Sequence, residues 1–121
     1  MFGAASGFSS DLNLSALNGS NGFKIYGVAA FDCSGRSVSS AGDVNGDGFD
    51  DLIIGANGAD PNALSYSGAS YVVFGAASGP ANGLNLSALD GSNGFKINGE
   101  AAYDRSGTSR VLCRGCERRW V

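Results

Sequence analysis

The chain has 121 residues, of which 20 are Gly, 43% are apolar and only 16% are charged. This composition excludes an intrinsically disordered segment, and so much Gly favours tight turns over long helices. The absence of His removes the usual general base of Ser and Cys hydrolases and the usual transition-metal ligand, so we expect no enzyme activity. No apolar run approaches the about 18 to 20 residues of a membrane span, and the first residues lack the layout of a signal peptide.

An internal repeat organises the chain. Residues 2–37 align with residues 74–109 at a constant offset of 72, with about 26 of 36 positions identical. The segment LNLSALNGSNGFKI at 12–25, for example, returns as LNLSALDGSNGFKI at 84–97. The apolar stretches of this unit are short and separated by Gly, Asn and Ser, which is typical of β-strands rather than helices.

One period of the repeat contains four predicted strands. They are residues 37–41, 52–56, 69–74 and 95–98, the last of which matches 23–26. Four short strands per repeat predict an all-β fold made of antiparallel β-propeller blades. Propellers close with about four to eight blades, so this chain would form an incomplete propeller. The alternative is a β-sandwich with two similar halves.

An acidic loop follows the first predicted strand. Residues 43–51 read DVNGDGFDD, which places oxygen-bearing side chains at loop positions one, three, five and nine and a Gly at position six. Such a spacing lets the oxygens converge on one hard cation while the Gly permits a sharp turn. The predicted ligands are Asp43, Asn45, Asp47, the Phe49 carbonyl and Asp51.

The ion that fits this loop best is Ca²⁺. Oxygen-only ligands disfavour zinc, and a flexible turn favours Ca²⁺ over Mg²⁺, which requires near-octahedral geometry. Position twelve is Ile54 instead of the Glu of an EF-hand, so the loop is expected on a β-hairpin rather than between helices. Asp50, at position eight, would point away. The competing interpretation is that Asn-Gly-Asp-Gly only makes a hairpin turn.

These residues resemble FG-GAP repeats, the units of the integrin α-subunit N-terminal propeller and of many bacterial surface and secreted proteins. The matching segments are AGDVNGDGFDDLIIGA (41–56), SGASYVVFG (67–75) and the two GFKI segments. The resemblance implies a propeller, usually of seven blades, with Ca²⁺ in the first hairpin of several blades and the same five ligands. It also implies an extracellular or cell-surface location.

The last twelve residues depart from the repeat. Residues 1–109 carry 4 basic and 10 acidic residues, whereas 110–121 carry 4 Arg and 1 Glu. Synonymous codons exist for 110–121 from which deletion of one base restores VSSAGDVNGDG, the sequence of 38–48. We therefore interpret 110–121 as a frame-shifted tail, which makes its Cys pair and Arg cluster by-products and removes the case for nucleic-acid binding.

The sequence thus predicts four parts. Residues 1–36 end a preceding blade, 37–98 form a complete blade with the calcium loop, 99–109 start the next blade, and 110–121 are the tail. The expected function is that of a calcium-binding, non-catalytic propeller repeat for surface interaction or adhesion, with further blades, self-association, or a protein or glycan ligand as partners. The alternatives are a scaffold fragment of a larger secreted enzyme or toxin, and a truncated product without function.

Overall fold

The structure is a computed structural model, and it describes residues 13–80 and 82–108. In chain order its elements are η1 (Leu14–Ala16), β1 (Ile25–Tyr26), β2 (Ser37–Gly42), β3 (Asp51–Ala56), η2 (Pro61–Ala63), β4 (Ala69–Val73), β5 (Leu84–Asn85), η3 (Leu86–Ala88) and β6 (Gly94–Asn98). The three η elements are single turns of 3₁₀ helix. The predicted tail of 110–121 and residues 1–12 lie outside the described residues.

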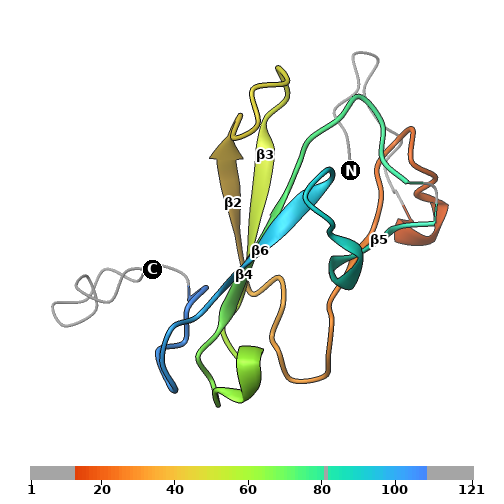
Figure 1. The fold of residues 1–121 in the computed structure, drawn as a ribbon. Coiled ribbons are helices and arrows are strands. Elements are labelled where there is room, and N and C mark those ends of the chain that lie inside the picture. Colours follow the sequence, from red (N-terminus) through yellow and green to blue (C-terminus); the bar gives the residue numbers. More distant parts are fainter. Residues whose placement is uncertain (1–12, 81, 109–121) are drawn as a thin grey trace, which may run out of the picture.

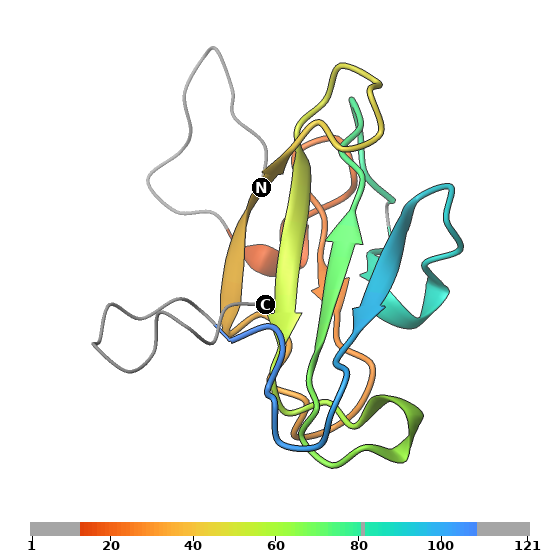
Figure 2. The same ribbon diagram turned by 60° about the vertical axis from the view of Figure 1, so that its left-hand side comes forward.

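Four strands form one antiparallel sheet in the order β2-β3-β4-β6, and all three pairings are antiparallel (Figures 1 and 2). These are the four strands that the sequence predicts, each within one residue at either end. The described residues contain no second sheet of similar size, so the predicted propeller blade is confirmed and the two similar halves of a sandwich are not found.

The strand β4 ends one residue earlier than predicted, at Val73. The backbone N–H of Phe74 donates to the carbonyl of Asn93 at 2.9 Å, and that of Gly75 donates to the Asp51 carboxylate at 2.8 Å. The backbone N–H groups of Phe74 and Gly75 thus bond to a turn carbonyl and to a side chain, and β4 ends before them.

The core lies on one face of the sheet, here called the core face. Its register places Ile54 beside Tyr71, and both side chains are almost fully buried. The segment that contains β1 and the segment that contains β5 and η3 cover this face, and Leu86 is buried in the same cluster (Figure 2). The strands β1 and β5 pair in parallel as a separate two-stranded sheet, with Ile25 opposite Leu84.

The opposite face of the sheet, here called the outer face, carries the row Ile53, Val72 and Phe95, which are register partners. Phe95 is 37% exposed, and Ile97 farther along β6 is 41% exposed. Alternation along the strands explains the two faces, because successive side chains of a strand point to opposite sides.

Among the described residues, no helix has the length and hydropathy that crossing a membrane requires.

Candidate metal centre

The acidic loop lies where the sequence predicts it, in the β2–β3 hairpin at one end of the sheet (Figure 1). The last pair of the hairpin joins Gly42 to Asp51, after a bulge at the end of β2. Gly46 and Gly48 adopt φ values of +76° and +91°, which residues with a Cβ atom rarely adopt. The Gly at position six, Gly48, is therefore required by the turn, as expected.

Three carboxylates converge in this loop. Asp43, Asp47 and Asp51 each offer an oxygen, and these oxygens all lie within 4.8 Å of one another. Asp43 and Asp47 are exposed, whereas Asp51 is buried at 3% exposure. The cluster of positions one, five and nine is thus formed by the fold, with one buried and two open members.

The Asp43 carboxylate shapes the turn. Its Oδ1 accepts hydrogen bonds from the backbone N–H of Gly46 at 2.8 Å and of Asp47 at 3.1 Å, and its Oδ2 accepts one from Gly48 at 2.8 Å. The loop therefore wraps around this side chain. A carboxylate oxygen has two lone pairs, so oxygens that accept one such bond keep acceptor capacity for a cation.

The Asp51 carboxylate joins the loop to the sheet. Its Oδ2 accepts a hydrogen bond from the N–H of Val44 at 2.7 Å, and its Oδ1 accepts the bond from Gly75. Gly75 lies 24 residues away in the chain, and no local sequence signal links it to this carboxylate. Two hydrogen bonds from backbone donors stabilise a buried carboxylate that would otherwise be costly.

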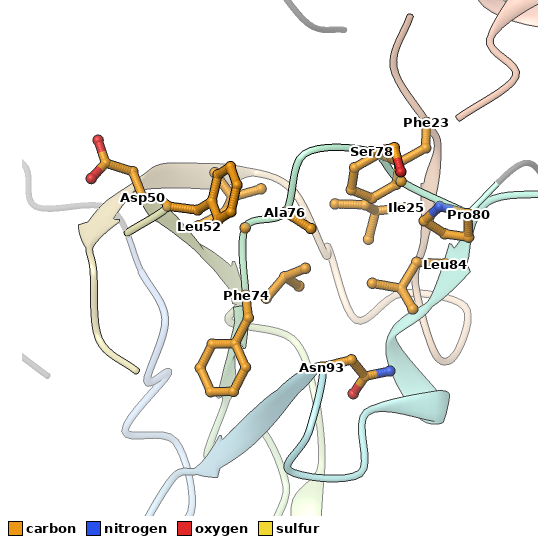
Figure 3. Close-up of a pocket in the computed structure, with 14 residues that line it drawn as sticks. Phe23, Ile25, Asp50, Leu52, Phe74, Ala76, Ser78, Pro80, Leu84 and Asn93 are labelled. Atoms are coloured by element: carbon orange, nitrogen blue, oxygen red, sulfur yellow. The ribbon is translucent and has the colours of Figure 1, made fainter. Parts of the chain in front are cut away.

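The other two predicted ligands lie beside the cluster. Asn45 is exposed and hydrogen-bonds Asp47 twice, donating from Nδ2 to Oδ2 at 3.1 Å and accepting the Asp47 N–H at 3.4 Å. The Phe49 N–H donates to Asp47 Oδ1 at 2.9 Å. Their assignment as ligands, the latter through its carbonyl, stays a prediction. Asp50 is outside the carboxylate cluster, and its side chain points away from the core (Figure 3).

The chemistry of the cluster fits a hard cation. Three carboxylates with oxygens this close repel one another, and a divalent ion between them would remove that repulsion. Oxygen donors without nitrogen or sulfur are those that Ca²⁺ prefers. The three Asp residues could hold such an ion, and the buried member would transmit its binding to the sheet.

A cleft of about 630 Å³ lies next to the loop, between the β1 segment and the core face. Its lining is mostly apolar, with Phe23, Ile25, Leu52 and Leu84 projecting into it (Figure 3). Phe23 and Ile25 precede the four-stranded sheet in the chain. The cleft therefore lies between the sheet and the segment that leads into it.

A comparison with protein-family models matches residues 34–73 to the FG-GAP repeat. No curated protein and no solved structure gives a match. The matched segment runs from just before β2 to the end of β4, so it contains the hairpin with all three clustered carboxylates. Residues 34–73 are therefore an FG-GAP repeat.

Proposed function

We propose that this chain is a calcium-stabilised, non-catalytic β-propeller repeat that serves interaction or adhesion outside the cell. The observation that carries the proposal is the convergence of Asp43, Asp47 and Asp51 within 4.8 Å in the hairpin of an FG-GAP repeat. In this proposal Asn45 and the Phe49 carbonyl complete the ligand set.

The position of the cluster explains why an ion would matter for the fold. Asp51 begins β3 and is hydrogen-bonded to Gly75 beyond β4, so the cluster is coupled to two adjacent strands of the sheet. An ion that binds the folded loop but not the unfolded chain stabilises the fold by linkage. At a free concentration ten times the Kd this stabilisation is about 1.4 kcal/mol.

The proposed location follows from the expected affinity. Extracellular calcium modules bind with Kd values on the order of 10⁻⁴ to 10⁻³ M. Such a site would be filled outside cells and largely empty at the calcium concentration of the cytosol. The partners in this proposal are further blades or other copies, and a protein or glycan ligand.

A calcium titration followed by thermal unfolding tests the proposal. We expect the midpoint of unfolding to rise with Ca²⁺ for the wild type and to stay constant for Asp43→Ala and Asp47→Ala. Asp50→Ala is the matched control, because it removes one carboxylate of the same loop that lies outside the cluster. A wild type that does not respond to Ca²⁺, or an Asp50→Ala variant that loses the response as fully as the other two, would refute the metal site.

A further inference from the structure

The repeat places two copies of one segment in different surroundings. Residues 94–107 form β6 and the chain that follows it, whereas residues 22–35 lead into β2. Each copy closes the same turns, with a hydrogen bond from Asp32 N–H to the Ala29 carbonyl in one and from Asp104 N–H to the Ala101 carbonyl in the other. Positive φ values recur at the equivalent positions, namely Phe31, Cys33 and Gly35 in one copy and Tyr103, Arg105 and Gly107 in the other. Around these turns the backbone conformations of the two copies therefore match.

The copy at 94–107 docks on the blade through its main chain. Five residues of β6 pair with β4. Beyond β6, backbone N–H groups donate to carbonyls of the β3–β4 connection and its end, namely Gly99 to Gly68, Tyr103 to Ser65, Arg105 to Tyr66 and Ser106 to Ser67. Main-chain contacts do not depend on the side chains, so the segment 22–35 has the groups needed to make the same contacts.

One Gly in each copy shows which surroundings the segment is shaped for. A Cβ atom at Gly99 would overlap the backbone carbonyl of Ser67, so this position must lack a side chain. Among the described residues, a Cβ at the equivalent Gly27 would meet only Ser34, with 3.2 Å between the two Cβ atoms. Neither position has a φ in the left-handed region, so the backbone conformation does not explain the Gly. In the described part of the chain, Gly27 has no backbone contact of the kind that requires Gly at position 99.

An aromatic residue gives the same result. The Tyr103 ring stacks on the Tyr66 ring with a centroid distance of 6.0 Å. The Arg105 guanidinium also lies over the Tyr66 ring, 4.8 Å from its centroid. The equivalent Phe31 is 91% exposed, compared with 66% for Tyr103 in its stacked position. A Phe ring could take the place of the Tyr103 ring against Tyr66 without loss of apolar contact.

The side chains of the two strands are complementary in a third way. Ile25 packs against the core face of the four-stranded sheet. Its equivalent, Ile97 in β6, lies on the outer face of the same sheet and is 41% exposed. If the strand of Ile25 paired with β4 of a second chain, Ile25 would take the place of Ile97 there and could still pack against the core face of its own chain. Within residues 13–80 and 82–108, the strand β1 pairs with β5 along one side only.

We infer that two copies of this chain associate by segment exchange, in which residues 22–35 of one copy take the place of residues 94–107 on the β4 edge and β3–β4 connection of the other. The copies then follow one another head to tail, each sheet beside the next. Such a contact is heterologous and can extend to several copies or close into a ring. The inference rests on the repeat and does not depend on calcium.

The segments 94–107 and 22–35 compete for the same docking site, and this competition sets the extent of exchange. The segment 94–107 is tethered to its site, with an effective concentration on the order of millimolar. If the contacts are equal, about 100 µM protein would have roughly one site in ten exchanged. Removing the docking of the tethered copy should therefore favour the exchanged form strongly.

A matched pair of substitutions tests the inference in the full chain. Gly99→Ala blocks docking of the internal segment. Gly27→Ala would block docking of the exchanged segment, and in the monomer it requires Ser34 to move by only a few tenths of an ångström. Light scattering after size-exclusion chromatography should show the oligomer fraction rising about tenfold in Gly99→Ala and falling below the wild-type value in Gly27→Ala. The double variant should lose the oligomers. A Gly99→Ala variant that is folded by circular dichroism and monomeric up to about 1 mM would overturn the inference.

Disulfide trapping covers the case in which Gly99→Ala does not fold. In a background with Cys33, Cys113 and Cys116 changed to Ser, Ala69→Cys and Asn98→Cys in one chain should form an internal bond, because these residues are register partners. A mixture of one chain with Ala69→Cys and another with Tyr26→Cys, the position equivalent to 98, should form a mixed dimer on oxidation. If the internal bond forms and no mixed dimer appears, segment exchange does not occur.

Discussion

The buried carboxylate of Asp51 accepts a hydrogen bond of 2.8 Å from the backbone N–H of Gly75. The other oxygen of the same group accepts one of 2.7 Å from Val44. One side chain therefore connects the acidic loop, the start of β3 and the chain just beyond β4. Its structural role in these hydrogen bonds is distinct from its proposed metal role.

We expect Asp51→Asn to destabilise the fold even in the presence of a calcium chelator. One of the two backbone donors would then face an amide NH₂ group instead of an oxygen, and an unsatisfied buried donor costs about 1 to 3 kcal/mol. Urea unfolding in the chelator should show this loss. Asp50→Asn, at an exposed site, should change the free energy of unfolding by less than about 0.5 kcal/mol. Equal effects of the two substitutions would contradict the role of the Gly75 contact.

Gly48→Ala should lower both stability and calcium affinity. No atom of the described residues lies within 4 Å of a Cβ placed at Gly48, so the expected cost comes from its φ of +91° and should be about 1 kcal/mol. Gly48→Asn should recover part of this loss, since Asn tolerates left-handed conformations better than Ala. Thermal unfolding with and without Ca²⁺ measures both effects, and an Ala variant as stable as the wild type would show that the turn does not need Gly.

Tyr71 should make the fold sensitive to alkaline pH. Burial, and to a smaller extent the negative charge of Asp32, raise the pKa of the Tyr71 hydroxyl above its ordinary value of 10.0. Below that value both the folded and unfolded states keep the proton, so stability is unaffected. As the pH rises from about 10 toward the folded-state pKa, the unfolded state ionises first and stability is lost.

The substitution Tyr71→Phe tests this pH dependence. It should remove part of the fall in unfolding free energy above pH 10, whereas Tyr26→Phe, at a 44% exposed residue, should leave the fall unchanged. Denaturant unfolding as a function of pH gives the comparison. Identical pH profiles for the wild type and Tyr71→Phe would show that another group controls alkaline unfolding.

Two neighbouring Ile residues distinguish the faces of the sheet. Ile54 is 4% exposed on the core face, so Ile54→Ala should cost about 2 to 5 kcal/mol through lost burial and a residual cavity. Ile53→Ala, on the outer face, should cost less than half as much in the monomer. Urea unfolding at low protein concentration provides the measurement, and a larger loss at Ile53 would mean that the core lies on the other side.

Local patterns predicted the strands and the loop because their signals are short-range. The β-branched run at 52–56 and the alternation at 95–98 correspond to β3 and β6 within one residue. The parallel pair of β1 and β5 was not predicted, since a two-residue pairing between segments almost sixty residues apart has no signature in either segment. The 3₁₀ turn of Leu-Ser-Ala was also missed, although it occurs in both copies of the repeat.

The amino-acid sequence by itself determined that this chain is built from a duplicated β-unit and that its acidic residues are spaced for a hard cation. Periodicity and turn chemistry are properties of neighbouring residues, so they can be read without coordinates. Only the tertiary structure decided that Asp51 is buried against Gly75, and that equivalent residues such as Gly27 and Gly99 have different surroundings. Burial and contact depend on which distant segments meet. Two repeat segments of nearly the same sequence do not tell which of them will pack against a given part of the sheet.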